Sequence, residues 1–287
     1  MIRIHTTGLI IALGLSPLTH AALLIDMDFE GFSSTVTTVG GGTITNAGTY
    51  GAAGNGTLNA YNGGSVSATT GQSGGTALQF NDVNGPGGTG NKGGLLIWQN
   101  PAITGDWSFM LSFKSSGAQA QYDRLFDTGR GSGDGASGIL YDGTSVDVLS
   151  FGVGSRVINI DRPADEVWMH LALVYDEDGG SGVNGLISAY VDGVSYPFPL
   201  GAFVNTGSDD LSPSAGFSIG VGSDVDNGFR PFTGAMDNLR IYDEPLSGAE
   251  VASIYGAVIP EPSTFIMMGV AFAGLIVSQR FKQHRSC

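Results

Sequence analysis

The segment FTGAMDNLRIY (residues 232–242) decides the fold. Residues 234–242 predict a β-strand, and simple alternation places Asp237 on the same face as Leu239 and Ile241. A carboxylate on an apolar face is costly unless it is paired or bound to a metal ion. Asp237 is therefore a candidate functional residue.

Further strands are predicted at residues 107–114, 167–175, 186–191 and 216–221. In residues 107–114, large apolar side chains at 107, 109, 111 and 113 alternate with Ser108, Met110, Ser112 and Lys114, which gives one face to the core. Residues 167–175 are apolar on both faces, as in the middle of a sandwich. Residues 186–191 lead into Asp192-Gly193, a favoured hairpin turn. Many short strands separated by turns predict an all-β fold, a two-sheet antiparallel β-sandwich or jelly roll.

One helix is predicted near the end of this region, over residues 248–255. Ser247 and Glu250 have the spacing of a capping box, and Leu246 and Val251 that of a hydrophobic staple. Earlier in the chain, residues 40–94 contain 18 glycines, which indicates either long loops or a stack of short strands. Apolar anchors are scattered through this segment at Leu58, Tyr61, Val66, Leu78 and Phe80.

Five segments of the second half carry a recognisable pattern: WMHLALVYD (168–176), AYVDG (189–193), FSIG (217–220), FTGAMDNLRIY (232–242) and PLS (245–247). In order and spacing they resemble the laminin-G-like branch of the concanavalin A-like lectin/glucanase superfamily. The resemblance extends from about residue 95 to residue 256. Before that, residues 28–30 and 77–80 fit the early strands of the family.

This resemblance implies one structural calcium ion between the first and last strands. Carried over to this sequence, the ligands are Asp28, Glu30 and Asp237, and backbone carbonyls and water complete the six to eight oxygens that Ca²⁺ takes. Alternation places Asp28 and Glu30 opposite the apolar side chains of residues 23–29, so the acids of the two strands can lie on different sides of the sheet. In the alternative interpretation, Asp237 hydrogen-bonds neighbouring backbone and the other two acids are solvated.

The composition excludes several classes of function. Residues 22–256 carry eight lysines and arginines against 25 acids, a net charge of −17, so nucleic acid is a poor partner. The one cysteine is Cys287, which excludes a thiol nucleophile or a zinc–thiolate site in residues 22–256. No two glutamates there form the Glu-x-Asp-x-x-Glu pattern of glycosidases with this fold. His170, the only histidine of this region, is predicted to be a hydrogen-bonded core residue.

Both ends of the chain predict export. Residues 1–21 have the basic start, short apolar stretch and small residues of a secretory signal peptide, with Ala21 and Ala22 at the cleavage site. The folded domain is predicted over residues 22–256.

Residues 259–287 contain Pro260-Glu261-Pro262, an apolar segment at 265–277 and a basic end. They resemble the PEP-CTERM sorting tail of Gram-negative bacteria, which an exosortase recognises and which is linked to exopolysaccharide. The alternative is a plain C-terminal membrane anchor formed by a short helix.

Together these patterns predict an exported, envelope-associated protein with a non-catalytic carbohydrate- or matrix-binding module. The predicted route is transient residence in the inner membrane through the tail, then the cell surface or the extracellular matrix. The expected partners are an exosortase-type enzyme and extracellular polysaccharide. Two other interpretations remain, an enzyme of the same fold that acts on polysaccharide and a purely structural surface protein. No residue is assigned to carbohydrate binding.

Overall fold

The computed structural model describes residues 21–61, 63–81, 92–98, 103, 105–117, 119, 123–127, 138–141, 148–153, 156–177, 186–196, 217–220 and 232–258. The strands are β1 (Leu23–Met27), β2 (Thr35–Val36), β3 (Gly42–Ile44), β4 (Gly56–Tyr61), β5 (Ser65–Thr70), β6 (Thr76–Asn81), β7 (Lys92–Trp98), β8 (Trp107–Ser115), β9 (Arg124–Asp127), β10 (Gly138–Tyr141), β11 (Val148–Val153), β12 (Arg156–Asp161), β13 (Met169–Asp176), β14 (Leu186–Val191), β15 (Val194–Ser195), β16 (Phe217–Ile219) and β17 (Gly234–Tyr242). A 3-10 helix, η1, spans Gly51–Gly54, and α1 spans Gly248–Val258.

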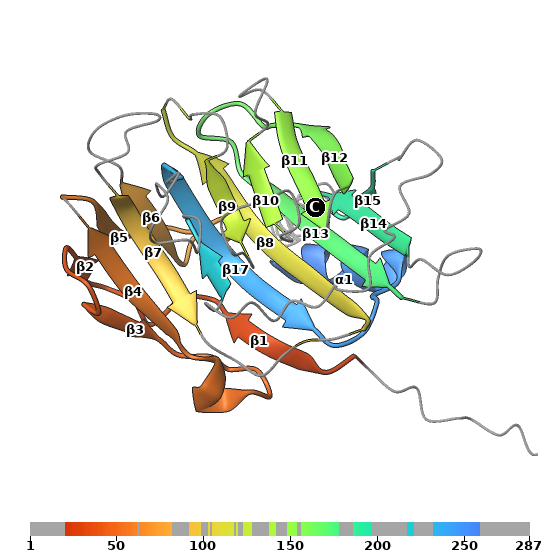
Figure 1. Ribbon diagram of the computed structural model, residues 1–287, viewed down its shortest axis with the longest axis horizontal. Coiled ribbons are helices and arrows are strands. Elements are labelled where there is room, and N and C mark those ends of the chain that lie inside the picture. Colours follow the sequence, from red (N-terminus) through yellow and green to blue (C-terminus); the bar gives the residue numbers. More distant parts are fainter. Residues whose placement is uncertain are drawn as a thin grey trace, which may run out of the picture.

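The strands form two antiparallel sheets (Figure 1). Sheet A has the order β15-β14-β13-β8-β17-β6-β5-β2, with β1 also paired to β17, and sheet B has the order β12-β11-β10-β9-β16-β7-β4-β3. The protein is thus all-β, with a jelly-roll-like sandwich, as the strand pattern predicts. No helix among the residues described above is long and apolar enough to cross a membrane.

Aromatic rings fill the space between the sheets. Phe109 of sheet A lies against Phe126 of sheet B, with ring centroids 4.1 Å apart, and Phe232 packs edge-on against Phe80 and Phe113. All five rings are fully buried. Each such ring stabilises the fold by about 1.5–3 kcal/mol, so this layer fixes how the sheets face each other.

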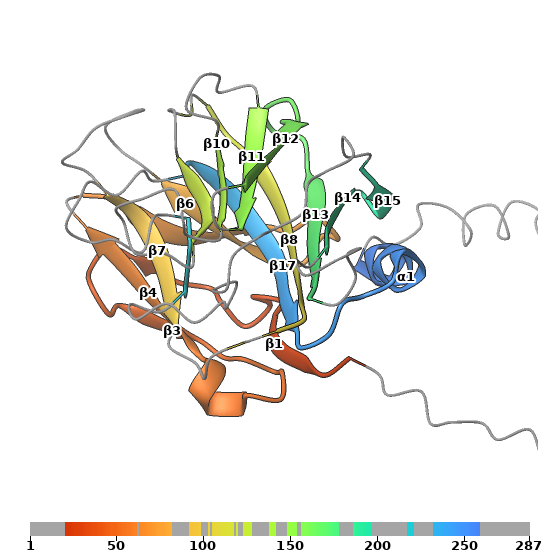
Figure 2. The same ribbon diagram turned by 45° about the vertical axis from the view of Figure 1, so that its right-hand side comes forward.

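A second, smaller cluster lies on the outer face of sheet A, where α1 packs (Figure 2). Its buried members are Met110, Ala172, Val174, Tyr242, Leu246 and Val251. The predicted capping box is confirmed, because the backbone N–H of Glu250 donates to Ser247 Oγ and that of Ser247 donates to Glu250 Oε2. The helix runs three residues further than predicted, to Val258.

The glycine-rich segment forms short strands in its described parts, which decides between the two predictions for it. Leu58, Val66, Leu78 and Phe80 are fully buried, as expected of anchors. One strand boundary was wrong: β13 begins at Met169, and Val167 is 51% exposed. The reason is a turn at Asp165 and Glu166, where Glu166 adopts a positive φ of 64°.

The predicted orientation of Asp237 was also wrong. The register of β17 against β8 shifts between Asp237 and Arg240, and Asn238 has a φ of 52°, so a β-bulge interrupts the alternation. Met236 and Leu239 both join the main core, whereas Asp237 is paired with Ser112 on the outer side of sheet A. The carboxylate therefore does not share the face of Leu239 and Ile241.

The bulge gives a testable prediction. The left-handed backbone at residue 238 suits asparagine or glycine but not a β-branched side chain. We expect Asn238→Val to lower the free energy of unfolding by about 1–2 kcal/mol, measured by urea denaturation. Asn238→Gly is the matched control and should unfold at or near the wild-type midpoint. Equal midpoints for the valine variant and the wild type would contradict a bulge at this position.

Candidate functional site

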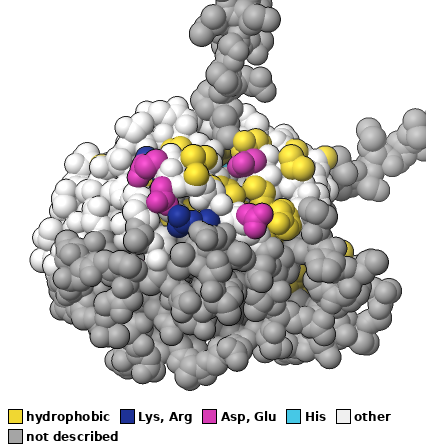
Figure 3. Space-filling view, turned by 90° about the horizontal axis from the view of Figure 1, so that it is seen from above, with side chains coloured by type: hydrophobic (Ala, Val, Ile, Leu, Met, Phe, Trp, Pro, Cys, Tyr) yellow, Lys and Arg dark blue, Asp and Glu magenta, His cyan; other side chains and the backbone are white. Residues whose placement is uncertain are grey.

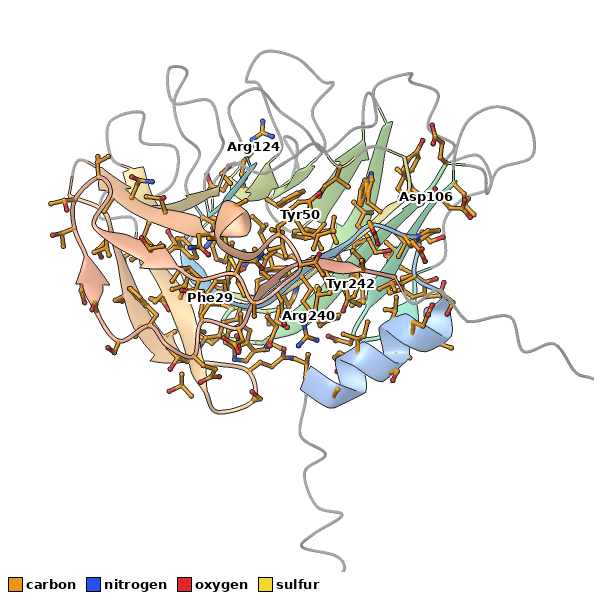
Figure 4. The ribbon with its side chains drawn as sticks, turned by 90° about the horizontal axis from the view of Figure 1, so that it is seen from below. Phe29, Tyr50, Asp106, Arg124, Arg240 and Tyr242 are labelled. Atoms are coloured by element: carbon orange, nitrogen blue, oxygen red, sulfur yellow. The ribbon has the colours of Figure 1, made fainter. Side chains whose placement is uncertain are left out.

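The candidate site lies at a junction beside β17, where one neighbouring strand ends and another begins. β6 pairs with residues 234–236 of β17, and β1 pairs with residues 239–242. Asp237 and Asn238 therefore have β8 on one side but no complete strand partner on the other. The end of β1 and the turn between β5 and β6 fill this space. Phe29 and Arg240, labelled in Figure 4, mark the junction seen from below.

The carboxylate of Asp237 is only 2% exposed and accepts two backbone hydrogen bonds. The N–H of Gln72 donates to Oδ2 at 3.0 Å, and the N–H of Asn238 donates to Oδ1 at 2.8 Å. Burial raises the pKa of Asp237 to about 6, against these hydrogen bonds, and the charges of Glu30 and Asp28 act in the same direction as burial. The carboxylate is thus ionised at neutral pH at an electrostatic cost.

The other two predicted ligands reach the same junction from the N-terminal strand. Phe29 has a φ of 61°, which turns the chain directly after β1. Glu30 Oε2 accepts the N–H of Thr76 at 3.1 Å, and Asp28 Oδ1 accepts the N–H of Glu30 at 3.2 Å. Both acids are exposed. The structure therefore brings Asp28, Glu30 and Asp237 into one neighbourhood.

Two glycines in the turn between β5 and β6 permit this arrangement. A Cβ atom on Gly71 would lie 2.5 Å from Asp237 Oδ2, and one on Gly75 would collide with the Glu30 carboxylate. The turn thus lies against both acids. Its glycines allow a close backbone approach within the antiparallel hairpin that β5 and β6 form.

The donor chemistry of the junction fits Ca²⁺, since carboxylate and amide oxygens are the ligands that this ion takes. Besides the three acids, Gln72 Oε1 is buried without a hydrogen-bond partner among the described residues. As they stand, no three Asp, Glu, His or Cys side chains in the described part of the chain form a metal-binding group. Calcium binding at this site stays a prediction.

Sequence reasoning missed Gln72 and Asn238. Asn238 Nδ2, like Gln72 Oε1, is a buried polar atom for which the described residues supply no partner. The signal for Asn238 was the Asp237-Asn238 pair within a strand, because asparagine tolerates a left-handed backbone. No sequence signal identified Gln72.

His170 lies on the outer face of sheet A under α1, directly opposite Ser112 of β8. It is 1% exposed, and its ring lies 5.4 Å from the ring of Tyr255 of α1. The predicted burial is confirmed, but Nδ1 has no hydrogen-bond partner within the described residues. Burial, with a smaller contribution from Arg240, lowers the pKa of His170 to about 4.

The two tryptophans whose side chains are described differ from each other. Trp107 is fully buried, whereas Trp168 is partly exposed. Lys114 Nζ lies 5.6 Å from the centre of the Trp168 ring and 3.0 Å from Glu166 Oε2.

On the face seen from above, acidic and basic side chains lie among hydrophobic ones (Figure 3).

Several predicted positions lie outside the described residues, namely Pro260, Glu261, Pro262 and the apolar segment 265–277.

Comparison with known families decides the relationship of the chain. The Laminin_G_3 model of the concanavalin A-like lectin/glucanases superfamily matches residues 89–252. The chain belongs to this superfamily. The match includes β8, β13 and β17 of sheet A and ends within α1. A search of curated proteins gave no match.

Among solved structures, proteins with different activities have the same fold as this chain. Domain 4 of AbnA, a GH43 extracellular arabinanase from Geobacillus stearothermophilus, was solved with arabinotriose. It matches with a TM-score of 0.53 and 20% identity over 82% of this chain and 98% of that domain. The binding domain of paraclostridial mosquitocidal protein 1 matches with a TM-score of 0.51 and 12% identity, over 82% of this chain and 52% of that one.

A sialidase from Trypanosoma rangeli, solved as a covalent intermediate with 2,3-difluorosialic acid, has a TM-score of 0.53 and 14% identity. The match covers 84% of this chain and 34% of the sialidase, so the chain spans about a third of that enzyme. At these identities the likeness concerns the fold alone.

His170 makes stability depend on pH in a defined direction. Its folded pKa lies below the unfolded value of 6.5, so its contribution is present above pH 6.5 and is lost as the pH falls toward 4. Between pH 7 and pH 4 we expect the wild type to lose about 3 kcal/mol more stability than His170→Gln. The measurement is urea denaturation of both proteins across this range. Parallel pH profiles would contradict a buried, neutral histidine.

Proposed function

We propose that the chain is an exported, non-catalytic carbohydrate- or matrix-binding module of the cell envelope. The observation that carries the proposal is how much of each related structure this chain covers. The chain covers nearly all of an arabinanase domain whose structure holds an oligosaccharide, but only a third of the sialidase. The unit thus has the size of a single ligand-binding domain. The competing functions are an enzyme of the same fold and a purely structural surface protein.

The roles of the described acids support a module without catalysis. Asp237 and Glu30 accept backbone N–H groups from the turn between β5 and β6 and from Thr76, and Glu166 is paired with Lys114. Asp165 and Asp26 form ion pairs with Arg162 and Arg240. A general acid or nucleophile needs a carboxyl group that faces substrate with a matching pKa. These carboxylates hold loops and strands in place instead.

Sorting to the cell surface is the second part of the proposal. Residues 1–21 direct export as a signal peptide, and Pro260-Glu261-Pro262 in the tail engages an exosortase-type enzyme. Before processing, the apolar segment 265–277 holds the protein in the inner membrane. The protein then reaches the surface or the extracellular matrix, where polysaccharide is its partner.

Calcium is the third part. We propose that one structural Ca²⁺ binds at the junction and is held by Asp237, Glu30 and Asp28. The buried carboxylate of Asp237, the charges of the other two acids and the unpartnered Gln72 Oε1 support this site. A bound cation would offset the repulsion among the acids and join the first strand to the last. Its role is structural and belongs to no chemical step.

The first test concerns ligand binding and turnover. We expect the purified protein to bind a subset of polysaccharides on a glycan array and to release no product from glucans, galactans or uronans. Reproducible hydrolysis that Glu166→Gln abolishes and Glu177→Gln preserves would establish the enzyme instead. Absence of any glycan binding, together with absence of turnover, would favour the structural role.

The calcium proposal predicts a change in melting temperature. A ligand that binds only the folded state stabilises it by about 2.7 kcal/mol at a hundredfold excess over Kd. We expect the melting temperature to rise with Ca²⁺ and to fall with chelator. Asp237→Asn should remove this dependence, whereas Asp165→Asn, which alters an exposed acid elsewhere, should keep it. Identical melting curves in calcium and in chelator would show that the junction holds no calcium.

A further inference from the structure

The start of the folded domain is held by Asp243, which lies near the end of the domain. The backbone N–H of Ala22 donates to Asp243 Oδ1 at 2.7 Å, and the N–H of Asp243 donates to the carbonyl of Ala22 at 3.2 Å. These two residues flank the paired ends of β1 and β17, where Leu23 lies opposite Tyr242. The contact therefore closes the β1–β17 pair.

The position of Ala22 is fixed by the fold on more than one side. The N–H of Thr49 donates to the carbonyl of Leu23 at 2.8 Å, and that of Tyr50 donates to the carbonyl of Leu24 at 3.2 Å. Ala22 packs against the main core, while Leu23 packs against the outer cluster under α1. These contacts hold the nitrogen of Ala22 at Asp243.

The carboxylate of Asp243 has no cationic partner among the described residues. Its carboxylate accepts a neutral amide N–H, and no lysine or arginine among the described residues forms an ion pair with it. An ionised acceptor binds a charged donor more strongly than a neutral one. The partner that would match this carboxylate is a cation at the position of the Ala22 nitrogen.

We propose that a signal peptidase cleaves between Ala21 and Ala22, and that the new α-ammonium group of Ala22 pairs with Asp243. In this step water hydrolyses the peptide bond: the Ala21 carbonyl carbon gains the hydroxyl group and becomes a carboxylate, and the Ala22 nitrogen takes the two protons released. The inference rests on the proposed export of the chain. It adds an acceptor for the mature N-terminus at the cleavage position that the sequence predicts.

Other cleavage positions do not fit the contact. A cut before Ala21 leaves the Ala22 nitrogen as a neutral amide, and a cut after Ala22 removes the residue that bonds with Asp243 in both directions. A small residue before the cut, here Ala21, is also what signal peptidases accept.

The first measurement is the mature N-terminus. The full chain is expressed in a Gram-negative host and purified from the envelope, and its N-terminal peptide is identified by mass spectrometry. We expect the peptide to begin at Ala22. A peptide that begins at any other residue would overturn the inference while leaving export intact, whereas retention of residues 1–21 would overturn both.

The second measurement is the pH midpoint of acylation of the α-amino group in the same protein. An α-amino group near no charge titrates at about 7.7–8, and the ion pair should raise the midpoint above this range. Asp243→Asn should return it to the range, while Glu244→Gln, the matched control at the next acid, should leave it raised. Equal midpoints in the wild type and Asp243→Asn would overturn the ion pair even if cleavage occurs at Ala22.

Discussion

The fold depends on the pairing of β17 with three other strands. β8 pairs with it along one edge, and β6 and β1 share the other edge. β17, near the end of the domain, thus joins the first strand (β1), a strand of the glycine-rich segment (β6) and the central strand β8 of sheet A. The interruption at Asp237 and Asn238 is where β6 gives way to β1, and it is the place where the acids gather. The edge of β17 that β6 and β1 share therefore underlies both the architecture of sheet A and the position of the candidate site.

Much of the fold follows from local patterns in the sequence. The alternation of residues 107–114 predicted β8, and the spacing of Ser247 and Glu250 predicted the start of α1. In both cases the predictive signal lies within a few residues, although β8 itself is held by pairing with the distant strands β13 and β17. The same holds for the turn at Asp192-Gly193, where both residues have positive φ.

The candidate site was predicted in its residues but not in its geometry. Asp28, Glu30 and Asp237 were named from the sequence, yet Asp237 was placed on the wrong face, because alternation cannot anticipate a bulge. The bulge coincides with the place where two separate strands share one edge of β17, and that sharing depends on pairing across more than 150 residues. The contact of the glycine-rich turn with Asp237 and Glu30 could not be predicted either, because the composition of the turn does not indicate which residues it contacts. Long-range contacts, more than side-chain chemistry, set the limit of the sequence analysis.

The pairing of the first strand with the last one also governs when the protein can fold. Ala22 and Asp243 are separated by 221 positions, so sheet A cannot close its β1–β17 edge before nearly the whole domain has been synthesised. Contacts between distant parts of a chain form slowly, because a long loop must be closed first. For a polypeptide threaded across a membrane, such delay is useful. If the chain is exported as proposed, its native topology becomes accessible only after its final strand has crossed the membrane.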